Sequence, residues 1–283
     1  MAIDYKINMM IYGAAELPAD WVYRGKYMQG EIDHDPFAFA CVRGGDRVIL
    51  IDCGANSEDP VKQAIFNDPV YHCMDLMSTP QASLALIGVA PEDVTDCILT
   101  HAHMDHMGAL ELFPNAHFYL QKEELEGWEA VAADPMRAPA LMPHCMDAND
   151  LVRARALVEE GRMTLVEGDV KDLLPGIDVY ALYNCHSNVD QMVCVNTPDG
   201  PYLYVGDLCT REVHLTGMPG VFEHYGWQTG SSGSAFRALA AFPKALALVD
   251  GDIKHIMIPH EIGYAQTRET VGRDGNAAAY LIR

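Results

Sequence analysis

The chain has 283 residues, of which 49% are hydrophobic and 21% charged, a composition that excludes disordered, collagen-like and coiled-coil proteins. It carries 19 Lys and Arg against 40 Asp and Glu, giving a formal net charge of −21. Such a charge repels phosphate backbones and anionic membrane surfaces, so we expect neither a nucleic-acid nor a membrane partner.

Short runs of β-branched and aromatic residues, bounded by Gly, Asp or Pro, predict strands along most of the chain. In chain order these runs are Tyr5–Tyr12, Phe37–Val42, Val48–Asp52, Cys97–Thr100, Ala116–Leu120, Met163–Glu167, Asp178–Tyr183, Gln191–Asn196, Tyr202–Val205 and His255–Ile258. Segments of helical character lie between them, namely Pro60–Phe66, Ser78–Gly88, Met107–Phe113, Lys122–Ala133, Asn149–Glu160 and Ser234–Asp250, the last interrupted near Pro243. This alternation favours an α/β fold with helix-covered sheets over an all-β barrel or a helical bundle.

Two segments predict long loops inside one domain, which we expect to span residues 1–283. Residues 133–149 are rich in Pro and Met, and residues 208–234 are rich in Gly and aromatic side chains. No apolar stretch has the length of a membrane span, and the first 17 residues lack the pattern of a signal peptide, so we expect a cytoplasmic protein. The eight cysteines include no C-x-x-C pair, which argues against a disulfide framework or a zinc ribbon.

The most informative segment follows the apolar run Cys97–Leu99 and contains four residues of metal-ligand type. His101 and His103 are two residues apart, so an extended chain presents both on one side. Asp105 and His106 open the following helix and point to a second position beside the first. Four such residues within six positions can build two adjacent metal sites.

This segment resembles the H-x-H-x-D-H signature of the metallo-β-lactamase superfamily, and further motifs of that family follow in the same order. They are the strand Val48–Asp52 followed by Cys53 and Gly54, then His186 in N-C-H-S, Asp207 in Y-V-G-D and His260 in I-P-H-E. The resemblance spans roughly residues 37–261 and implies a four-layer αβ/βα sandwich with the metals between the sheet edges.

The resemblance also implies a set of ligands for two divalent metal ions. The first ion would be held by His101, His103 and His186, the second by Asp105, His106 and His260, with Asp207 shared between them. Imidazole and carboxylate ligands without thiolate suit zinc, our first choice, and also tolerate iron, manganese or cobalt.

Two divalent ions would lower the pKa of a bridging water and make it a nucleophile near neutral pH. The remaining positive charge would polarise a carbonyl oxygen, as an acyl hydrolase requires. The family implies a second role for Asp105 in handling a proton as the intermediate collapses. Asp52 either orients a metal-bound histidine or serves only as the turn residue at the end of its strand.

Within the superfamily the chain resembles the N-acyl homoserine lactonase and pyridoxolactonase group. The expected substrate is therefore a small lactone or related cyclic ester; an isothiocyanate, a thioester or a cyclic amide is the alternative. Lactonases usually have Pro-Gly before the third histidine and tyrosine three residues after the bridging Asp, where this chain has Asn184-Cys185 and Thr210.

The loop after Asp207 is expected to cover the metals and contact the substrate. Its candidates are His214, His224, Tyr225 and Trp227, with Phe222 nearby, although an aromatic-stabilised surface loop would have the same composition. A homodimer is the default expectation for a soluble enzyme. A redox diiron centre and a non-enzymatic metal-binding module are the alternatives from other functional classes.

Overall fold

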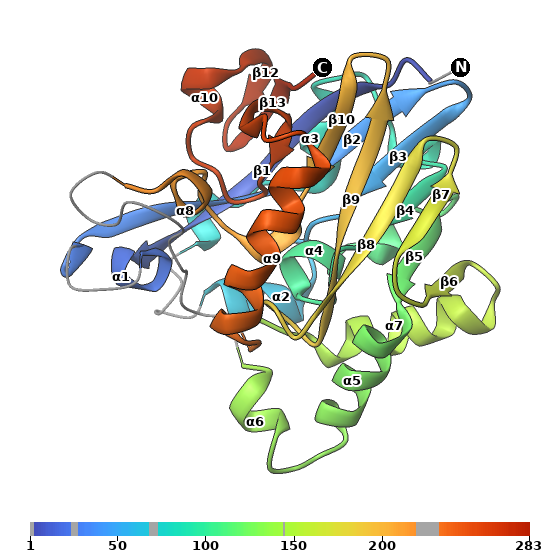
Figure 1. Ribbon diagram of the computed structural model, residues 1–283. Helices are drawn as coiled ribbons and strands as arrows, with labels where there is room; N and C mark the ends of the chain where they lie inside the picture. The colour runs from blue at the N-terminus through green and yellow to red at the C-terminus, as the bar shows by residue number, and fades with distance from the viewer. Residues whose placement is uncertain (1–2, 24–27, 68–72, 144, 219–231) are drawn as a thin grey trace.

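The computed structural model describes residues 3–23, 28–67, 73–143, 145–218 and 232–283, and two sheets form its centre (Figure 1). The larger sheet has eight strands in the order β12 (Glu269–Asp274), β13 (Ala277–Leu281), β1 (Lys6–Pro18), β2 (Ile32–Gly44), β3 (Arg47–Ile51), β4 (Asp96–Ile98), β5 (His117–Gln121) and β6 (Met163–Val166). The smaller has five, in the order β11 (Ile256–Met257), β10 (Gly200–Tyr204), β9 (Val189–Thr197), β8 (Ile177–Tyr183) and β7 (Val170–Leu174).

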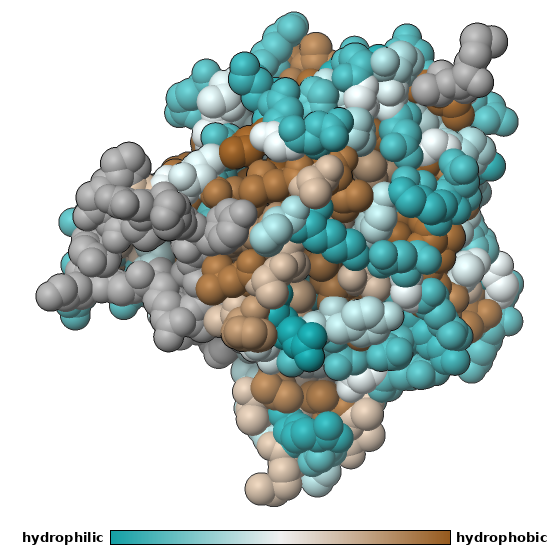
Figure 2. Space-filling model, viewed as in Figure 1, coloured by the Kyte–Doolittle hydropathy of each residue, from teal (hydrophilic) through white to brown (hydrophobic). Residues whose placement is uncertain are grey.

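Helices cover the outer face of each sheet. On the larger sheet these are α2 (Pro60–Phe66), α3 (Pro80–Ala85), α4 (Met104–Met107), α5 (Lys122–Ala132) and α7 (Ala148–Glu159). On the smaller sheet it is α9 (Ala235–Leu248), and Figure 2 shows apolar side chains gathered over this helix. The short helices are α1 (Ala19–Val22), α6 (Ala138–Leu141), α8 (Val213–Thr216) and α10 (Tyr264–Thr267).

Three apolar clusters hold these four layers together. Alternate residues of one strand enter different clusters: Ile7 and Met9 of β1 face the smaller sheet, whereas Met10 and Tyr12 face the helices. A third cluster joins the smaller sheet to α9. Because both faces of the central strands are buried, their sequences are continuously apolar. The predicted four-layer αβ/βα sandwich is confirmed.

Several predicted elements differ from the structure. The predicted helix Met107–Phe113 is wrong, because α4 begins three residues earlier and ends before Gly108, after which only a 3-10 turn follows. The predicted interruption at Pro243 is also wrong: α9 is continuous, since its buried face, including Phe242, packs on the sheet and compensates for one missing hydrogen bond. The predicted loop at residues 133–149 contains α6, and α8 lies in the predicted loop at residues 208–234.

The topology brings chain segments together at one edge of the sandwich. Strands β3, β4 and β5 pair in parallel, so their carboxyl ends meet at one edge of the larger sheet. In the smaller sheet β10 and β11 also pair in parallel. The predicted metal ligands other than His186 follow β4, β10 and β11, and Asp52 follows β3. No helix in the described ranges is long and apolar enough to cross a membrane.

Candidate metal centre

The turn after β4 carries the H-x-H-x-D-H residues, and its local geometry follows from the sequence. His103 has extended backbone angles and is the N-cap of the single-turn helix α4, and His101 lies two residues before it in the same turn. Gly108 ends this helix; a Cβ atom there would lie 2.1 Å from the carbonyl oxygen of Met104, so only glycine fits. All three histidines of the segment, including His106, are buried.

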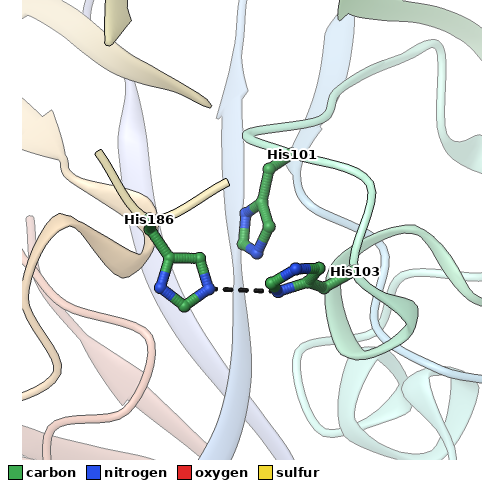
Figure 3. Close-up of side chains that lie close together, drawn as sticks. All are labelled: His101, His103 and His186. Carbon is green, nitrogen blue, oxygen red and sulfur yellow. Dashed lines mark hydrogen bonds between the residues drawn. The ribbon is translucent and has the colours of Figure 1, made fainter. Parts of the chain in front are cut away.

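The first group of ligand residues consists of His101, His103 and His186 (Figure 3). His186 comes from the turn between β8 and β9, on the other sheet. Its Nε2 atom lies 3.0 Å from Nδ1 of His103, and the ring centroid of His101 is 4.5 Å from that of His103 and 4.9 Å from that of His186. The three rings therefore converge on one point from two sheets.

The second group consists of Asp105, His106 and His260, and Asp207 lies between the two groups. Oδ2 of Asp105 is 3.3 Å from Nε2 of His106 and 3.6 Å from Nε2 of His260. Oδ1 of Asp207 lies 3.2 Å from Nε2 of His260, whereas Oδ2 of Asp207 lies 3.3 Å from Nε2 of His186. One carboxylate thus faces both groups with different oxygens.

The candidate ligands differ in protonation state. Burial lowers the pKa of His106 and His260, but the neighbouring carboxylates outweigh it and raise both values, so a cation would displace a proton from each of these imidazoles. Burial lowers the pKa of His186 to about 3, so its imidazole is neutral. Burial raises the pKa of Asp105, but the neighbouring His106 and His260 outweigh it and lower that pKa to about 2. Nε2 of His101 is buried and has no hydrogen-bond partner among the described residues, an arrangement that costs free energy unless something binds there. The donor set fits a divalent metal ion.

Asp52 contacts both the H-x-H-x-D-H turn and one of its histidines. Its Oδ1 accepts a hydrogen bond from the backbone N–H of Thr100 at 2.7 Å, and its Oδ2 lies 2.7 Å from Nδ1 of His106. A carboxylate at that position holds the proton on Nδ1 and leaves Nε2 of His106 to face the ligand cluster. Asp52 also has a positive φ of 64° at the strand end, so its geometry is compatible with both of the roles that the sequence left open.

We expect Asp52→Asn to lower the metal affinity of the second group by about 10- to 100-fold. Asparagine tolerates the positive φ, but its amide can place an N–H against Nδ1 of His106 and reverse the tautomer. Metal titration with a competing chelator measures the effect. Asp172→Asn is the matched control, because Asp172 also has a positive φ, of 49°, and is exposed on β7. Equal affinities in Asp52→Asn and wild type would show that Asp52 is only a turn residue.

A cavity of about 380 Å³ opens onto the ligand cluster. His103, Asp105, His186, Asp207 and His260 line its floor. Most of the remaining wall is apolar, with Leu17, Trp21, Val22, Phe37, Phe66, Met104, Leu141 and Pro143 among its residues. The ligand cluster therefore meets an apolar space large enough for a small organic molecule.

The residues predicted to contact the substrate differ in their position relative to this cavity. His214 lies in α8, buried with its ring centroid 5.8 Å from that of Tyr23, and it is not among the described residues that line the cavity. His224, Tyr225, Trp227 and Phe222 lie outside the described residues. Thr210, which follows Asp207 by three residues, does line the cavity.

Sequence reasoning missed two charged residues that support His260. Oδ2 of Asp35 lies 3.1 Å from Nδ1 of His260, and Arg211 forms ion pairs with Asp35 at 2.9 Å and with Asp33 at 2.8 Å. Arg211 also donates a hydrogen bond to the backbone carbonyl of His260. No sequence spacing links residues so far apart in the chain, because only the packing of one sheet against the other brings them together.

The family model described as the metallo-beta-lactamase superfamily matches residues 40–251. The chain belongs to the metallo-beta-lactamase superfamily. Among curated proteins, the mouse metallo-beta-lactamase domain-containing protein 1 is 62% identical over 34 residues, which are 12% of this chain and 13% of that protein. A probable metallo-hydrolase of Mycobacterium tuberculosis is 27% identical over 99 residues, 34% of this chain and 31% of that protein. The chain thus matches less than a third of these relatives' length.

Solved structures with a similar fold include a protein with a bound homoserine derivative and a lactonase. The chain resembles the AiiA protein of B. thuringiensis, in a mutant with N-decanoyl-L-homoserine bound, with a TM-score of 0.67 and 20% identity, covering 95% of this chain and 98% of that one. It also resembles AidC, a dizinc quorum-quenching lactonase, with a TM-score of 0.66 and 20% identity, covering 93% and 90% of the two chains. At 20% sequence identity, the similarity to these two structures establishes the fold alone.

Proposed function

We propose that the chain is a dinuclear metal-dependent hydrolase that opens a small lactone or a related cyclic ester. The observation that carries the proposal is Asp207, whose two oxygens face two adjacent groups of histidine and carboxylate ligands at 3.2 to 3.3 Å. A shared carboxylate between two such groups is the arrangement that suits a pair of metal ions. Zinc suits the nitrogen and oxygen donors best.

Different residues of the chain would have different roles in such a reaction. When bound, the metal ions supply a water nucleophile at neutral pH and polarise the substrate carbonyl. Asp105 lines the cavity as an ionised carboxylate, so its Oδ2 would accept the proton that the attacking water gives up and pass that same proton to the leaving alkoxide oxygen. Asp52 fixes the tautomer of His106. Nδ1 of His260 lies 2.8 Å from the backbone carbonyl oxygen of Pro36 and 3.1 Å from Oδ2 of Asp35, and either oxygen can accept its proton.

The cavity supports a small apolar substrate. Most of its wall is apolar, which favours a substrate that carries apolar groups around its reacting carbonyl. The two solved relatives named above bind a homoserine derivative or act as a lactonase, which supports the lactone class.

Metal analysis of the purified chain, paired with hydrolysis assays, tests the proposal. We expect about two zinc or similar ions per chain and turnover of a lactone, abolished by chelation and restored by added metal. The assay panel contains lactones, thioesters, cyclic amides and isothiocyanates at equal concentration. Turnover of one of the last three alone would keep the metal centre and reject the lactone. A chain that binds no metal would reject the whole proposal.

A further inference from the structure

Glu124 is a fully buried carboxylate on α5 whose position relates directly to the first ligand group. Its Oε1 accepts a hydrogen bond from the backbone N–H of Ala102 at 3.0 Å and another from the hydroxyl of Ser187 at 2.6 Å. Its Oε2 accepts a hydrogen bond from the backbone N–H of Val189 at 2.7 Å. A single side chain therefore contacts two segments that lie 85 to 87 positions apart in the sequence.

Both of these segments carry metal ligands. Ala102 stands between His101 and His103 in the turn after β4 of the larger sheet, and Ser187 follows His186 in the turn between β8 and β9 of the smaller sheet. Glu124 belongs to neither sheet. Its carboxylate bridges the gap between the two sheets on the side next to the three imidazoles.

Two further residues complete this connection. Nε1 of Trp128, one turn along α5, donates to Oε1 of Glu124 at 3.0 Å and to the hydroxyl of Ser187 at 2.8 Å, and its ring meets His103 edge-on with centroids 5.6 Å apart. Asp190 accepts hydrogen bonds from the backbone N–H groups of His186 at 2.9 Å and Ser187 at 2.8 Å. The turn that carries His186 is thus held by carboxylates on two sides.

All the groups that contact Glu124 in these bonds are donors. An ionised carboxylate has about four acceptor sites and no proton, so it can satisfy every one of them. A glutamine of the same shape would turn an N–H toward a donor on one side, and the buried donor there would lose its partner. The requirement is therefore for a carboxylate, and not only for a side chain of this size.

We propose that Glu124 is a positioning residue that sets the distance between the His101–His103 turn and His186, and so the metal affinity of the first group. The inference depends on the proposed function, because it assumes that this group binds a metal. Ligands on two separate sheets bind one ion tightly only when the protein holds them together in advance. The second group, formed by Asp105, His106 and His260, has no hydrogen bond to Glu124 among the described contacts.

The test compares metal binding by the wild type, Glu124→Gln and a matched control, Glu126→Gln, which makes the same change at an exposed position of α5. We expect Glu124→Gln to weaken metal binding by the first group about 10- to 100-fold and to leave binding by the second group close to wild type. Titration with Co²⁺ in the presence of a competing chelator reports both affinities, and the visible absorption of the ion identifies the site that changed. General destabilisation would weaken both sites alike.

A milder variant keeps the test valid if Glu124→Gln does not fold. Ser187→Ala removes one of the bonds to Glu124 and leaves the carboxylate in place, so we expect a smaller loss of affinity at the same site. Two sites with wild-type affinities and wild-type Co²⁺ spectra in a folded Glu124→Gln protein would overturn the inference. A wild type that binds no metal would reject the proposed function itself, and the inference with it.

Discussion

Asp207→Asn is expected to abolish hydrolysis and to lower metal affinity by more than about a hundredfold. Removing an outer-shell partner of a metal ligand costs about 10- to 100-fold, and Asp207 contacts both ligand groups directly. Asparagine keeps the size of the side chain but removes the negative charge that faces His186 and His260. The measurement combines metal content after dialysis with initial rates on the lactone that the wild type hydrolyses best.

The matched control for this prediction is Asp274→Asn, at an exposed position of β12. It makes the same change in the net charge of the chain, so we expect wild-type metal content and wild-type rates. Circular dichroism of both variants checks that the fold is intact. Complete loss of metal from Asp207→Asn with unchanged turnover would disprove the metal-dependent mechanism.

Lys62→Met is expected to destabilise the folded chain by about 3–5 kcal/mol, because it removes one partner of a buried ion-pair network. Nζ of Lys62 lies 2.9 Å from Oδ1 of Asp150 and 3.1 Å from Oδ2 of Asp147, and all three side chains are buried. In the variant the two carboxyl groups lose their buried cation. Urea denaturation of the metal-free proteins measures the difference in the free energy of unfolding.

The loss of stability in this variant is expected to depend on pH. Burial raises the pKa of Asp150 to about 6 even though Lys62 opposes the shift, so the folded chain binds its proton more tightly than the unfolded chain. Such a group contributes stability below its ordinary pKa and loses it as the pH rises through the folded value. Removing Lys62 raises the folded pKa further, and we expect Lys62→Met to be more destabilised at pH 8 than at pH 4.

Lys122→Met is the control for both parts of this prediction. Lys122 forms an ion pair with Glu167 at 3.2 Å, but both side chains are exposed, so its loss leaves the stability near that of wild type. A difference between Lys62→Met and wild type that grows toward low pH would contradict the assigned role of the buried network.

Local sequence patterns predicted most strands and the first four ligand residues. His101, His103, Asp105 and His106 follow one short strand, so the geometry of a few consecutive residues brings them together. Strands β12 and β13 were missed for physical reasons. β12 is mostly exposed and polar with no apolar alternation, whereas β13 begins with three alanines, which become buried only through packing between β12 and β1.

The chain by itself determined the class of fold, the order of the motifs that carry the candidate metal ligands and the chemical type of each candidate, because these depend on residue identity and spacing. The tertiary structure alone decided which groups support the ligands. Glu124 contacts Ala102 and Ser187, and Asp35 contacts His260. These residues are far apart in the sequence, and no local pattern predicts such contacts. It also decided that His214 lies against Tyr23 within the core. Such contacts depend on how two sheets pack, and packing is a property of the whole chain.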